Sequence, residues 1–521
     1  MHKFGLPSPA LVIVPRPGVA FVTGREALKG ERLVRGGEWR TLHKRLVVAV
    51  LMAGVTSVIA GVTPVPARAI SGQAPPSVHV PEFTVVPSRG LVGSFGGFGG
   101  QFNQHVFADI SGPPPDLSGL EAKVMALGPR YVRVFFNNSE WTFPDRMASF
   151  VRTVQLANRA GAAIEVAWQG GSFAFAMQNM PRFADVLTDL LEHQGIPGSL
   201  WVSLYNEPNS SVLTLPQYEQ TYRLLDAELR ARGVRDRIHF MGGGILGTTS
   251  PLGQSQADWY WYMAEHMGDL LDGWAPHIYW DFWDTPKIER RLSEVRRIFA
   301  AIPDQQRRPL YVTEFGVRGL RTFEGELTFE PGFYPDGTPI AVTTKAAFEE
   351  AWFMIRATQL SYVAAAKWDL YDATYDIGTQ DYSAIGPGVD GWPIRPLYRL
   401  LQLITLTTRP VGGSIVDVVP AACADLRKLL TAYIAPSGDV TILGLDTDGA
   451  AIAAGWDPVV YSLGGLPPNT RFRLLAWNAD GSGTNIEIGF VDTDSDGTIE
   501  FSVPLQGVFA LTTVPLGSLP W

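Results

Sequence analysis

Residues 201–208 read WVSLYNEP, a largely apolar run that ends in Asn206, Glu207 and a proline. Residues 309–316, PLYVTEFG, repeat this arrangement about a hundred residues later, with Glu314 near the end of the run. Short apolar runs of this kind predict buried β-strands. Each glutamate is therefore expected where a strand ends.

Strand-like runs alternate with amphipathic helical stretches on both sides of these two segments. The eight predicted strands are 91–97, 131–136, 163–168, 201–205, 238–242, 273–279, 309–313 and 364–368. A helical pattern follows each of them, and Thr214 with Gln217 has the form of a capping box before one of these helices. Eight such units and no ninth favour a closed (β/α)8 TIM barrel over residues 91–408 rather than an open doubly wound sheet.

The segments that flank the barrel have a different composition. From residue 409 to 521, short alternating runs separated by turn residues predict a C-terminal all-β sandwich. Residues 70–90 are rich in Pro and Ser without a sustained period, which predicts a linker. The segment 317–343 is long for a strand–helix connection, and we expect either a wall over one face of the barrel or a solvated excursion.

Residues 1–69 have the order of a secretory signal preceded by an extension. The basic residues 43–45 precede the apolar stretch 46–62, and the small-residue triplet 67–69 follows, so cleavage is expected after Ala69. An uncleaved membrane anchor is the alternative, although about 17 apolar residues are short for a span. We expect a protein that is secreted or associated with the cell envelope, with no stable membrane insertion after cleavage.

Charge and cysteine content exclude several classes of partner. Residues 1–69 hold 10 of the 42 Lys and Arg but 3 of the 51 Asp and Glu, which leaves 32 against 48 and a net charge of about -16 in the remainder. Nucleic acids and anionic membranes require clustered basic residues, so a neutral substrate fits better. The single cysteine, Cys423, excludes an intramolecular disulfide and a cysteine-rich metal site. An exported protein without disulfides is expected to be bacterial.

The two glutamates have the arrangement that sugar cleavage requires. In a strand–helix barrel the carboxyl ends of the strands meet at one face, and Glu207 and Glu314 end the fourth and seventh predicted strands. Retaining glycoside hydrolysis uses one carboxyl group to protonate the leaving oxygen and another to attack the anomeric carbon. For either glutamate alone, a structural ion pair is an equally good interpretation.

Other polar and aromatic residues at the same strand ends favour the paired interpretation. An arginine or tyrosine that donates to the nucleophile keeps it ionised, an asparagine can hold a sugar hydroxyl, and a tryptophan can form a floor under the ring. The expected substrate contacts are Arg133, Asn206, His277, Tyr279, Trp280 and Trp368. Further candidates for polar sugar contacts, after the first strand, are Gln101, Asn103, Gln104 and His105.

These motifs resemble those of clan A retaining glycoside hydrolases, closest to family 5 cellulase-like enzymes, with family 39 as a near neighbour. The matching segments are Asn206-Glu207-Pro208, His277-Ile278-Tyr279, Thr313-Glu314-Phe315-Gly316, Trp368 and Arg133. The resemblance covers about residues 91–407. It implies that Glu207 is the acid/base and Glu314 the nucleophile.

The sequence therefore predicts a secreted hydrolase of O-glycosidic bonds, expected to be β-linked, in a poly- or oligosaccharide. The double-displacement mechanism needs no metal and no organic cofactor. Two alternatives use the same barrel: a catalytically inactive carbohydrate-binding or cell-surface protein, and a transglycosylase with the same two carboxylates. The sequence does not distinguish between oligomeric states.

Overall fold

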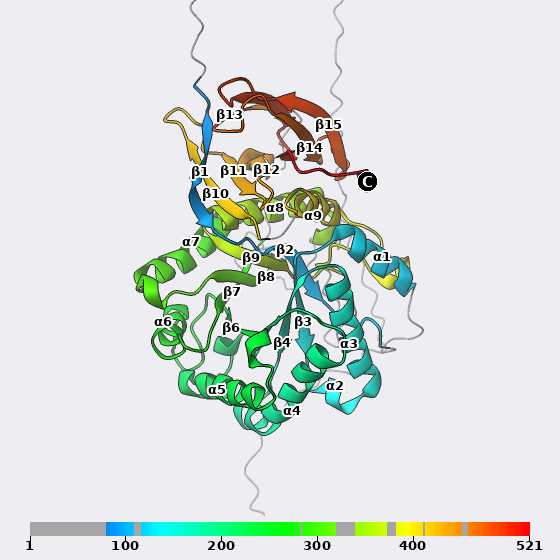
Figure 1. Ribbon diagram of the computed structural model, residues 1–521, viewed down its shortest axis with the longest axis vertical. Helices are drawn as coiled ribbons and strands as arrows, with labels where there is room; N and C mark the ends of the chain where they lie inside the picture. The colour runs from blue at the N-terminus through cyan, green and yellow to red at the C-terminus, as the bar shows by residue number, and fades with distance from the viewer. Residues whose placement is uncertain are drawn as a thin grey trace, which may run out of the picture. The chain divides into compact units, whose positions relative to one another are not determined.

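Eight parallel strands form a closed barrel in which the last strand pairs with the first (Figure 1). The computed structural model describes residues 80–108, 116–281, 284–318, 339–371, 382–409, 412–450 and 457–520. The barrel strands are β2 (Gly97–Phe102), β3 (Tyr131–Phe136), β4 (Ala163–Trp168), β5 (Leu200–Leu204), β6 (Ile238–Ile245), β7 (Gly273–Asp281), β8 (Leu310–Arg318) and β9 (Tyr362–Lys367). The predicted (β/α)8 barrel is thus confirmed.

Helices follow the strands and surround the barrel (Figure 1). They are α1 (Leu117–Leu127), α2 (Ser139–Thr142), α3 (Pro144–Arg159), α4 (Phe173–Glu192), α5 (Leu215–Ala231), α6 (Gln256–His266), α7 (Thr285–Ala301), α8 (Thr344–Gln359) and α9 (Pro396–Thr407). The capping box predicted for α5 is present, with reciprocal hydrogen bonds between Thr214 and Gln217. Tyr218, Tyr222 and Leu225 lie three or four residues apart on the buried face of this helix.

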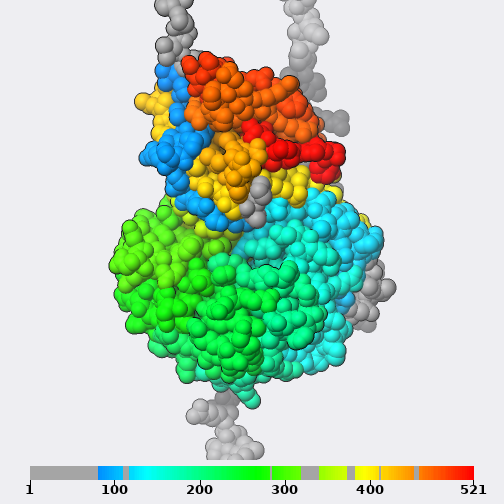
Figure 2. Space-filling view, viewed as in Figure 1, coloured from blue at the N-terminus to red at the C-terminus, as the bar shows by residue number. Residues whose placement is uncertain are grey.

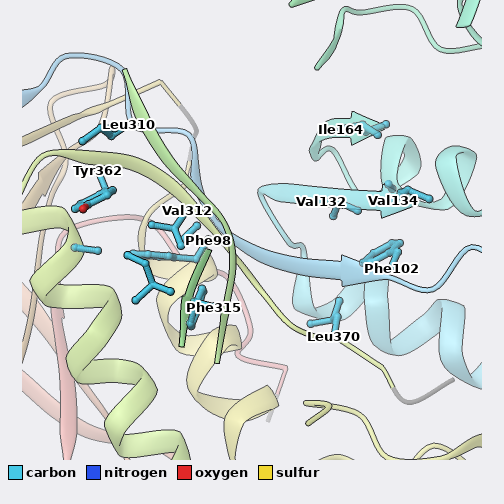
Figure 3. Close-up of a cluster of buried hydrophobic side chains, with 14 of the residues drawn as sticks. Phe98, Phe102, Val132, Val134, Ile164, Leu310, Val312, Phe315, Tyr362 and Leu370 are labelled. Atoms are coloured by element: carbon cyan, nitrogen blue, oxygen red, sulfur yellow. The ribbon is translucent and has the colours of Figure 1, made fainter. Parts of the chain in front are cut away.

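Side chains of each barrel strand alternate between the surrounding helices and the barrel interior. Val132 and Val134 of β3, with Ile164 of β4, belong to the outward-facing cluster that packs under the helices (Figure 3). The interior is filled by a separate cluster of buried residues: Tyr131, Met241, Ala275, Tyr311, Ala364 and Ala366. This alternation determines which residues at the strand ends can meet inside the barrel.

A second, nine-stranded sheet forms the β domain. Its strands are β1 (Phe83–Val92), β10 (Ser414–Pro420), β11 (Lys428–Ile434), β12 (Val440–Asp446), β13 (Pro458–Gly464), β14 (Arg471–Trp477), β15 (Asn485–Asp492), β16 (Ile499–Pro504) and β17 (Val508–Thr512), in the order β15-β14-β17-β12-β11-β10-β1-β13-β16. The sheet folds onto itself, because Phe509 of β17 packs against Tyr461 of β13 and Phe501 of β16 with ring centroids 4.7 and 5.0 Å apart. This is the predicted β-sandwich.

The amino-terminal boundary differs from the prediction. The strand expected at 91–97 is the end of β1 and the start of β2, and β1 pairs with β10 and β13 of the sandwich rather than with the barrel. In Figure 2, blue amino-terminal residues accordingly lie against the yellow and orange residues of the sandwich. The linker expected at 70–90 is therefore strand from Phe83 onward, and its residues 70–79 lie outside the described residues. A β-bulge between Val86 and Gly90 explains the error, because the Pro-Ser-Arg run there interrupts the two-residue period.

Two further predictions concern residues outside the described ranges: the signal at 1–69 and residues 319–338 of the long segment 317–343. Among the described helices, none combines the length and the apolar character needed to cross a membrane.

The sandwich and helices α8 and α9 share hydrogen bonds and apolar core. Thr358 Oγ1 of α8 donates to Thr431 Oγ1 at 2.9 Å, and Trp477 Nε1 donates to the Pro396 carbonyl at 3.0 Å. Alternate residues of β12 divide between two cores, since Ile442 lies inside the sandwich whereas Leu443 belongs to the core of the barrel helices. Every residue of β12 is consequently buried.

Candidate active site

The structure brings most of the predicted residues together at the carboxyl ends of the barrel strands. Arg133 lies on β3, Asn206 and Glu207 follow β5, His277 and Tyr279 lie on β7, Glu314 lies on β8 and Trp368 follows β9. These are the second, fourth, sixth, seventh and eighth strands of the barrel. Residues up to 235 positions apart in the chain thus share one end of the barrel, as Arg133 and Trp368 show.

Glu314 is a nearly buried carboxylate that has two hydrogen-bond donors and lies 3.6 Å, through its Oε2, from His277 Nδ1. Arg133 Nη1 donates to Glu314 Oε2 at 2.8 Å, and the Tyr279 hydroxyl donates to Glu314 Oε1. The side chain of Glu314 is 8% exposed, so these contacts act with little screening by water. An adjacent positive charge and a hydroxyl donor both favour the ionised form of a carboxyl group.

Glu207 is more exposed than Glu314 and lies next to His277. Its Oε1 is 3.1 Å from His277 Nδ1, and its side chain is 23% exposed. Glu207 and Tyr205 both have left-handed backbone angles, with φ of 52° and 65°, at the turn between β5 and the short helix η1 (Pro208–Ser210). Non-glycine residues with such angles concentrate at functional sites, where the surrounding structure holds them in place.

The two carboxyl groups lie close enough to act on one bond. One oxygen of Glu207, one oxygen of Glu314 and a ring nitrogen of His277 all lie within 4.8 Å of one another. Retaining glycosidases hold their carboxyl groups about 5–5.5 Å apart, whereas inverting enzymes need about 6.5–9.5 Å to admit a water molecule. Carboxyl oxygens within 4.8 Å of each other are compatible with the shorter of these two spacings.

Arg133 connects the surroundings of both glutamates. In addition to its bond to Glu314, its Nη2 donates to Asn206 Oδ1 at 2.9 Å, next to Glu207 in the chain. Arg133 is 1% exposed, and its guanidinium carbon lies 4.6 Å from the centroid of the Phe135 ring. The Phe135 ring in turn lies 5.7 Å from the ring of Trp368, which remains partly exposed. Trp368 is thus linked to Arg133 through the Phe135 ring, and part of its surface is accessible to solvent.

The prediction that Trp280 lines the cleft is wrong. Trp280 is fully buried, its Nε1 donates to Glu349 of α8 at 3.0 Å, and its ring stacks on Phe353 at 5.2 Å. The cause is the two-residue period of β7. His277 and Tyr279 face the barrel interior, so Trp280 must face the helices.

Amide side chains near the end of β2 are buried with unused hydrogen-bonding capacity. Gln101 lies opposite Arg133 in the register of β2 and β3. Gln101 Oε1, Asn103 Nδ2 and both amide atoms of Gln104 have no hydrogen-bond partner among the residues that the structure describes. His105, in contrast, pairs with Glu140 at 2.7 Å. Buried amides without partners are costly, which is consistent with groups that bind a polar ligand.

Two further residues position the site: Glu165, for which an ion pair was the preferred interpretation from the sequence, and Gly244, which was not predicted. Glu165 of β4 lies beneath Arg133, with its Oε1 3.5 Å from Arg133 Nε. Gly244, with φ of 73°, packs against Glu207 and His277. The run of three glycines, 242–244, at the end of the fifth strand was the available signal, since glycine allows close approach of backbone to neighbouring groups.

Within the described ranges, Glu207, His277 and Glu314 are the group of side chains with the spacing of a metal site. Their surroundings do not suit a cation. The guanidinium of Arg133 already pairs with Glu314 at 2.8 Å and would repel a metal ion at that oxygen. The donor set instead fits a pair of carboxyl groups with different hydrogen-bonding partners.

No family model matches the chain, and no curated protein matches it. Solved structures do match. The glycoside hydrolase family 30 subfamily 8 xylanase Xyn30A from Clostridium acetobutylicum has a TM-score of 0.56 at 12% identity, over 83% of this chain and 99% of that one. In fold, the chain is similar to glycoside hydrolases.

Two further structures extend this likeness. The GH51 α-L-arabinofuranosidase from Thermotoga petrophila RKU-1 has a TM-score of 0.59 at 12% identity, over 83% of this chain and 100% of that one. A conserved exported protein from Bacteroides fragilis has a TM-score of 0.59 at 11% identity, with the same coverage. The expected resemblance to clan A is confirmed for the fold, with families 30 and 51 among the matches.

Proposed function

We propose that the protein is a retaining glycoside hydrolase of a poly- or oligosaccharide, with Glu314 as nucleophile and Glu207 as acid/base. The observation that carries this proposal is that one oxygen of Glu207 lies within 4.8 Å of one oxygen of Glu314, while the two groups have unlike surroundings. Glu314 has a guanidinium and a phenol as donors, which suits a group that must stay ionised. Glu207 has a histidine and partial access to solvent, which suits a group that exchanges protons.

The reaction proceeds in two displacements. In the first, a Glu314 oxygen bonds to the anomeric carbon while the bond to the leaving oxygen breaks, and Glu207 gives its proton to that oxygen. In the second, Glu207 takes a proton from water, whose oxygen bonds to the anomeric carbon and releases Glu314. Each carboxyl group thereby returns to its starting state, and the sugar keeps its configuration.

The substrate is proposed to be a neutral, β-linked saccharide. Unpartnered amide atoms of Gln101, Asn103 and Gln104 support recognition of hydroxyl groups, and Asn206 and Trp368 would hold the sugar at the reacting centre. Aryl β-glycosides and β-linked polysaccharides are therefore the first substrates to test. Xylan and aryl α-L-arabinofuranosides belong in the same panel because proteins of similar fold are named xylanase and arabinofuranosidase.

The test compares the wild type with Glu314→Gln and Glu207→Gln. Glu314→Gln should lose at least about 1,000-fold in kcat because the covalent route is removed, and Glu207→Gln should lose about 100- to 10,000-fold because general acid–base catalysis is removed. Proton NMR of the first product should show a retained anomer. Equal activity in Glu314→Gln would remove it as nucleophile, and an inverted product would contradict the proposed mechanism.

The same assays separate the alternatives. A folded wild type that binds saccharides and cleaves none would indicate the inactive binding protein. New glycosidic bonds in the presence of an acceptor sugar would indicate the transglycosylase.

We propose in addition that the protein is exported, from the signal-like pattern of residues 1–69. Mass spectrometry of the protein from the culture medium or envelope fraction should find Ile70 as its first residue. A cytoplasmic chain that retains residues 1–69 would contradict export.

A further inference from the structure

Glu165 is a fully buried carboxylate that the two displacement steps do not use. Tyr131 donates its hydroxyl to Glu165 Oε2 at 2.6 Å, and Ser203 Oγ donates to Glu165 Oε1 at 2.6 Å. Burial and the adjacent Glu165 raise the pKa of Tyr131 well above its ordinary value, so the phenol keeps its proton and remains a donor. Both oxygens of Glu165 therefore act as acceptors, which is the bonding pattern of an ionised carboxylate.

Arg133 is held by a different residue on each edge of its guanidinium. Nη1 donates to Glu314, and Nη2 donates to Asn206. Nε faces Glu165 Oε1 at 3.5 Å, a distance that gives charge attraction without a hydrogen bond. One buried guanidinium thus lies between two carboxylates, and only one of them belongs to the proposed catalytic pair. The other titratable groups that face Glu314 are His277 and Tyr279 of β7, with His277 Nδ1 3.6 Å from Glu314 Oε2.

We propose that Glu165 is a positioning residue that fixes Arg133 so that it reaches Glu314 and Asn206 together, and that shares the positive charge of Arg133 with Glu314. This inference rests on the proposed function for its catalytic consequence. The electrostatic part of the proposal does not depend on a sugar. The negative charge of Glu165 opposes ionisation of Glu314. The hydroxyls of Tyr131 and Ser203 limit that effect because they stabilise Glu165.

Stability alone is a weak explanation for this arrangement. Burying charged groups away from water costs several kcal/mol per ion, and well-packed apolar residues in their place are often neutral or stabilising. The side chains around Glu165 provide such a setting, because Tyr131, Tyr311 and Trp201 form an aromatic layer with ring centroids 4.9–5.7 Å apart. The charge of Glu165 is placed where it acts on Arg133.

The test is Glu165→Gln, which keeps the shape of the side chain and removes its charge. The acidic limb of the pH profile of kcat/KM should move to lower pH by about one unit, because a negative charge near Glu314 is lost. The matched control is Glu349→Gln, which also neutralises a fully buried glutamate but on α8, where Gln can still accept from Trp280. Its acidic limb should stay within about 0.2 units of the wild type.

A second measurement needs no substrate. In the full chain labelled with 13C at the glutamate carboxyl carbons, the Glu314 signal is assigned by its absence in Glu314→Gln. Its titration midpoint should fall in Glu165→Gln and stay in place in Glu349→Gln. If the wild type cleaves no glycoside, the proposed function fails, while this titration still decides the role of Glu165.

A folded Glu165→Gln protein with an unchanged acidic limb and an unchanged Glu314 midpoint overturns the proposal. If Glu165→Gln does not fold, Ser203→Ala replaces it. This change frees the Glu165 oxygen that faces Arg133 Nε, so Arg133 should turn toward Glu165 and the Glu314 midpoint should rise. An unchanged midpoint in folded Ser203→Ala overturns the proposal as well.

Discussion

At the scale of single residues, the two carboxylates of the site differ through their neighbours rather than through their own chemistry. Glu314 accepts from Arg133 and Tyr279 and is nearly buried, whereas Glu207 is more exposed and lies nearer to His277 Nδ1, at 3.1 Å against 3.6 Å. A glutamate can serve as nucleophile or as proton donor, and the surroundings decide between the two roles. The same dependence on surroundings applies to a buried ion pair between α8 and β9.

Glu350 of α8 and Lys367 of β9 form that pair. Lys367 Nζ lies 3.2 Å from Glu350 Oε1 and also donates to the carbonyl of Trp368. Burial outweighs the attraction of Lys367 and raises the pKa of Glu350 to about 7 from 4.5. A carboxyl group whose pKa is raised by folding binds its proton more tightly in the folded state, so its contribution to stability is complete below pH 4.5 and is lost as the pH rises through 7.

We predict that Glu350→Gln removes this pH dependence. The difference in free energy of unfolding between wild type and variant should shift by about 3 kcal/mol in favour of the variant between pH 4.5 and pH 7.5. Urea unfolding at four pH values across this range measures it. A constant difference at all four values would show that Glu350 has the same pKa in the folded and unfolded chain.

At the scale of strands and helices, the sequence predicts most of what positions the site. Seven of the predicted strands overlap β3 to β9, since each is a buried apolar run between turn residues. The sequence predicts less well whether a given side chain of a strand points into the barrel or toward the helices. Trp280 was predicted to face the cleft because of its place in the chain, but the period of β7, fixed by His277 and Tyr279, turns it outward.

The glycines at the end of β6 position the neighbouring strand ends. A Cβ added at Gly244 would lie 3.2 Å from the backbone nitrogen of Glu207 and 3.2 Å from His277 Nε2. These contacts are tighter than ordinary van der Waals distances, so one of the two residues must move. The sequence shows the glycines but not which residues approach them.

We predict that Gly244→Ala lowers kcat/KM at least about tenfold, because small displacements of reacting groups cost large factors in rate. The control is Gly233→Ala, in the exposed turn after α5, where φ is 74° and a Cβ would meet nothing within 4 Å. Both variants carry the cost of a left-handed alanine, about 1–2 kcal/mol of stability. Only Gly244→Ala should lose activity, and equal activity in the two variants would show that Glu207 and His277 tolerate the added methyl group.

At the scale of the whole molecule, the two ends of the described chain build one sheet around the barrel sequence. β1 pairs with β10 over a separation of more than 300 residues, with Phe83 opposite Pro420. No local pattern in the sequence reveals such a partner, and the Pro-Ser-Arg bulge conceals the strand itself. In the sequence, strands of the sandwich therefore lie both before and after the barrel.

This arrangement predicts that the sandwich cannot fold fully without the amino-terminal strand. A chain that starts at Gly93 lacks Phe83 and Val85, which are 4% and 3% exposed, and leaves β10 and β13 without the strand between them. Loss of two buried apolar side chains costs about 3 kcal/mol or more, and unpaired strand edges promote aggregation. The control chain starts at Val80 and keeps β1. It should match the longer protein in urea unfolding, whereas the chain from Gly93 should unfold at lower urea.

Because α8 and α9 share their core with β12, any saccharide cleavage should be lost in the same transition as the sandwich. Barrel activity that survives unfolding of the sandwich would show that the two parts are independent.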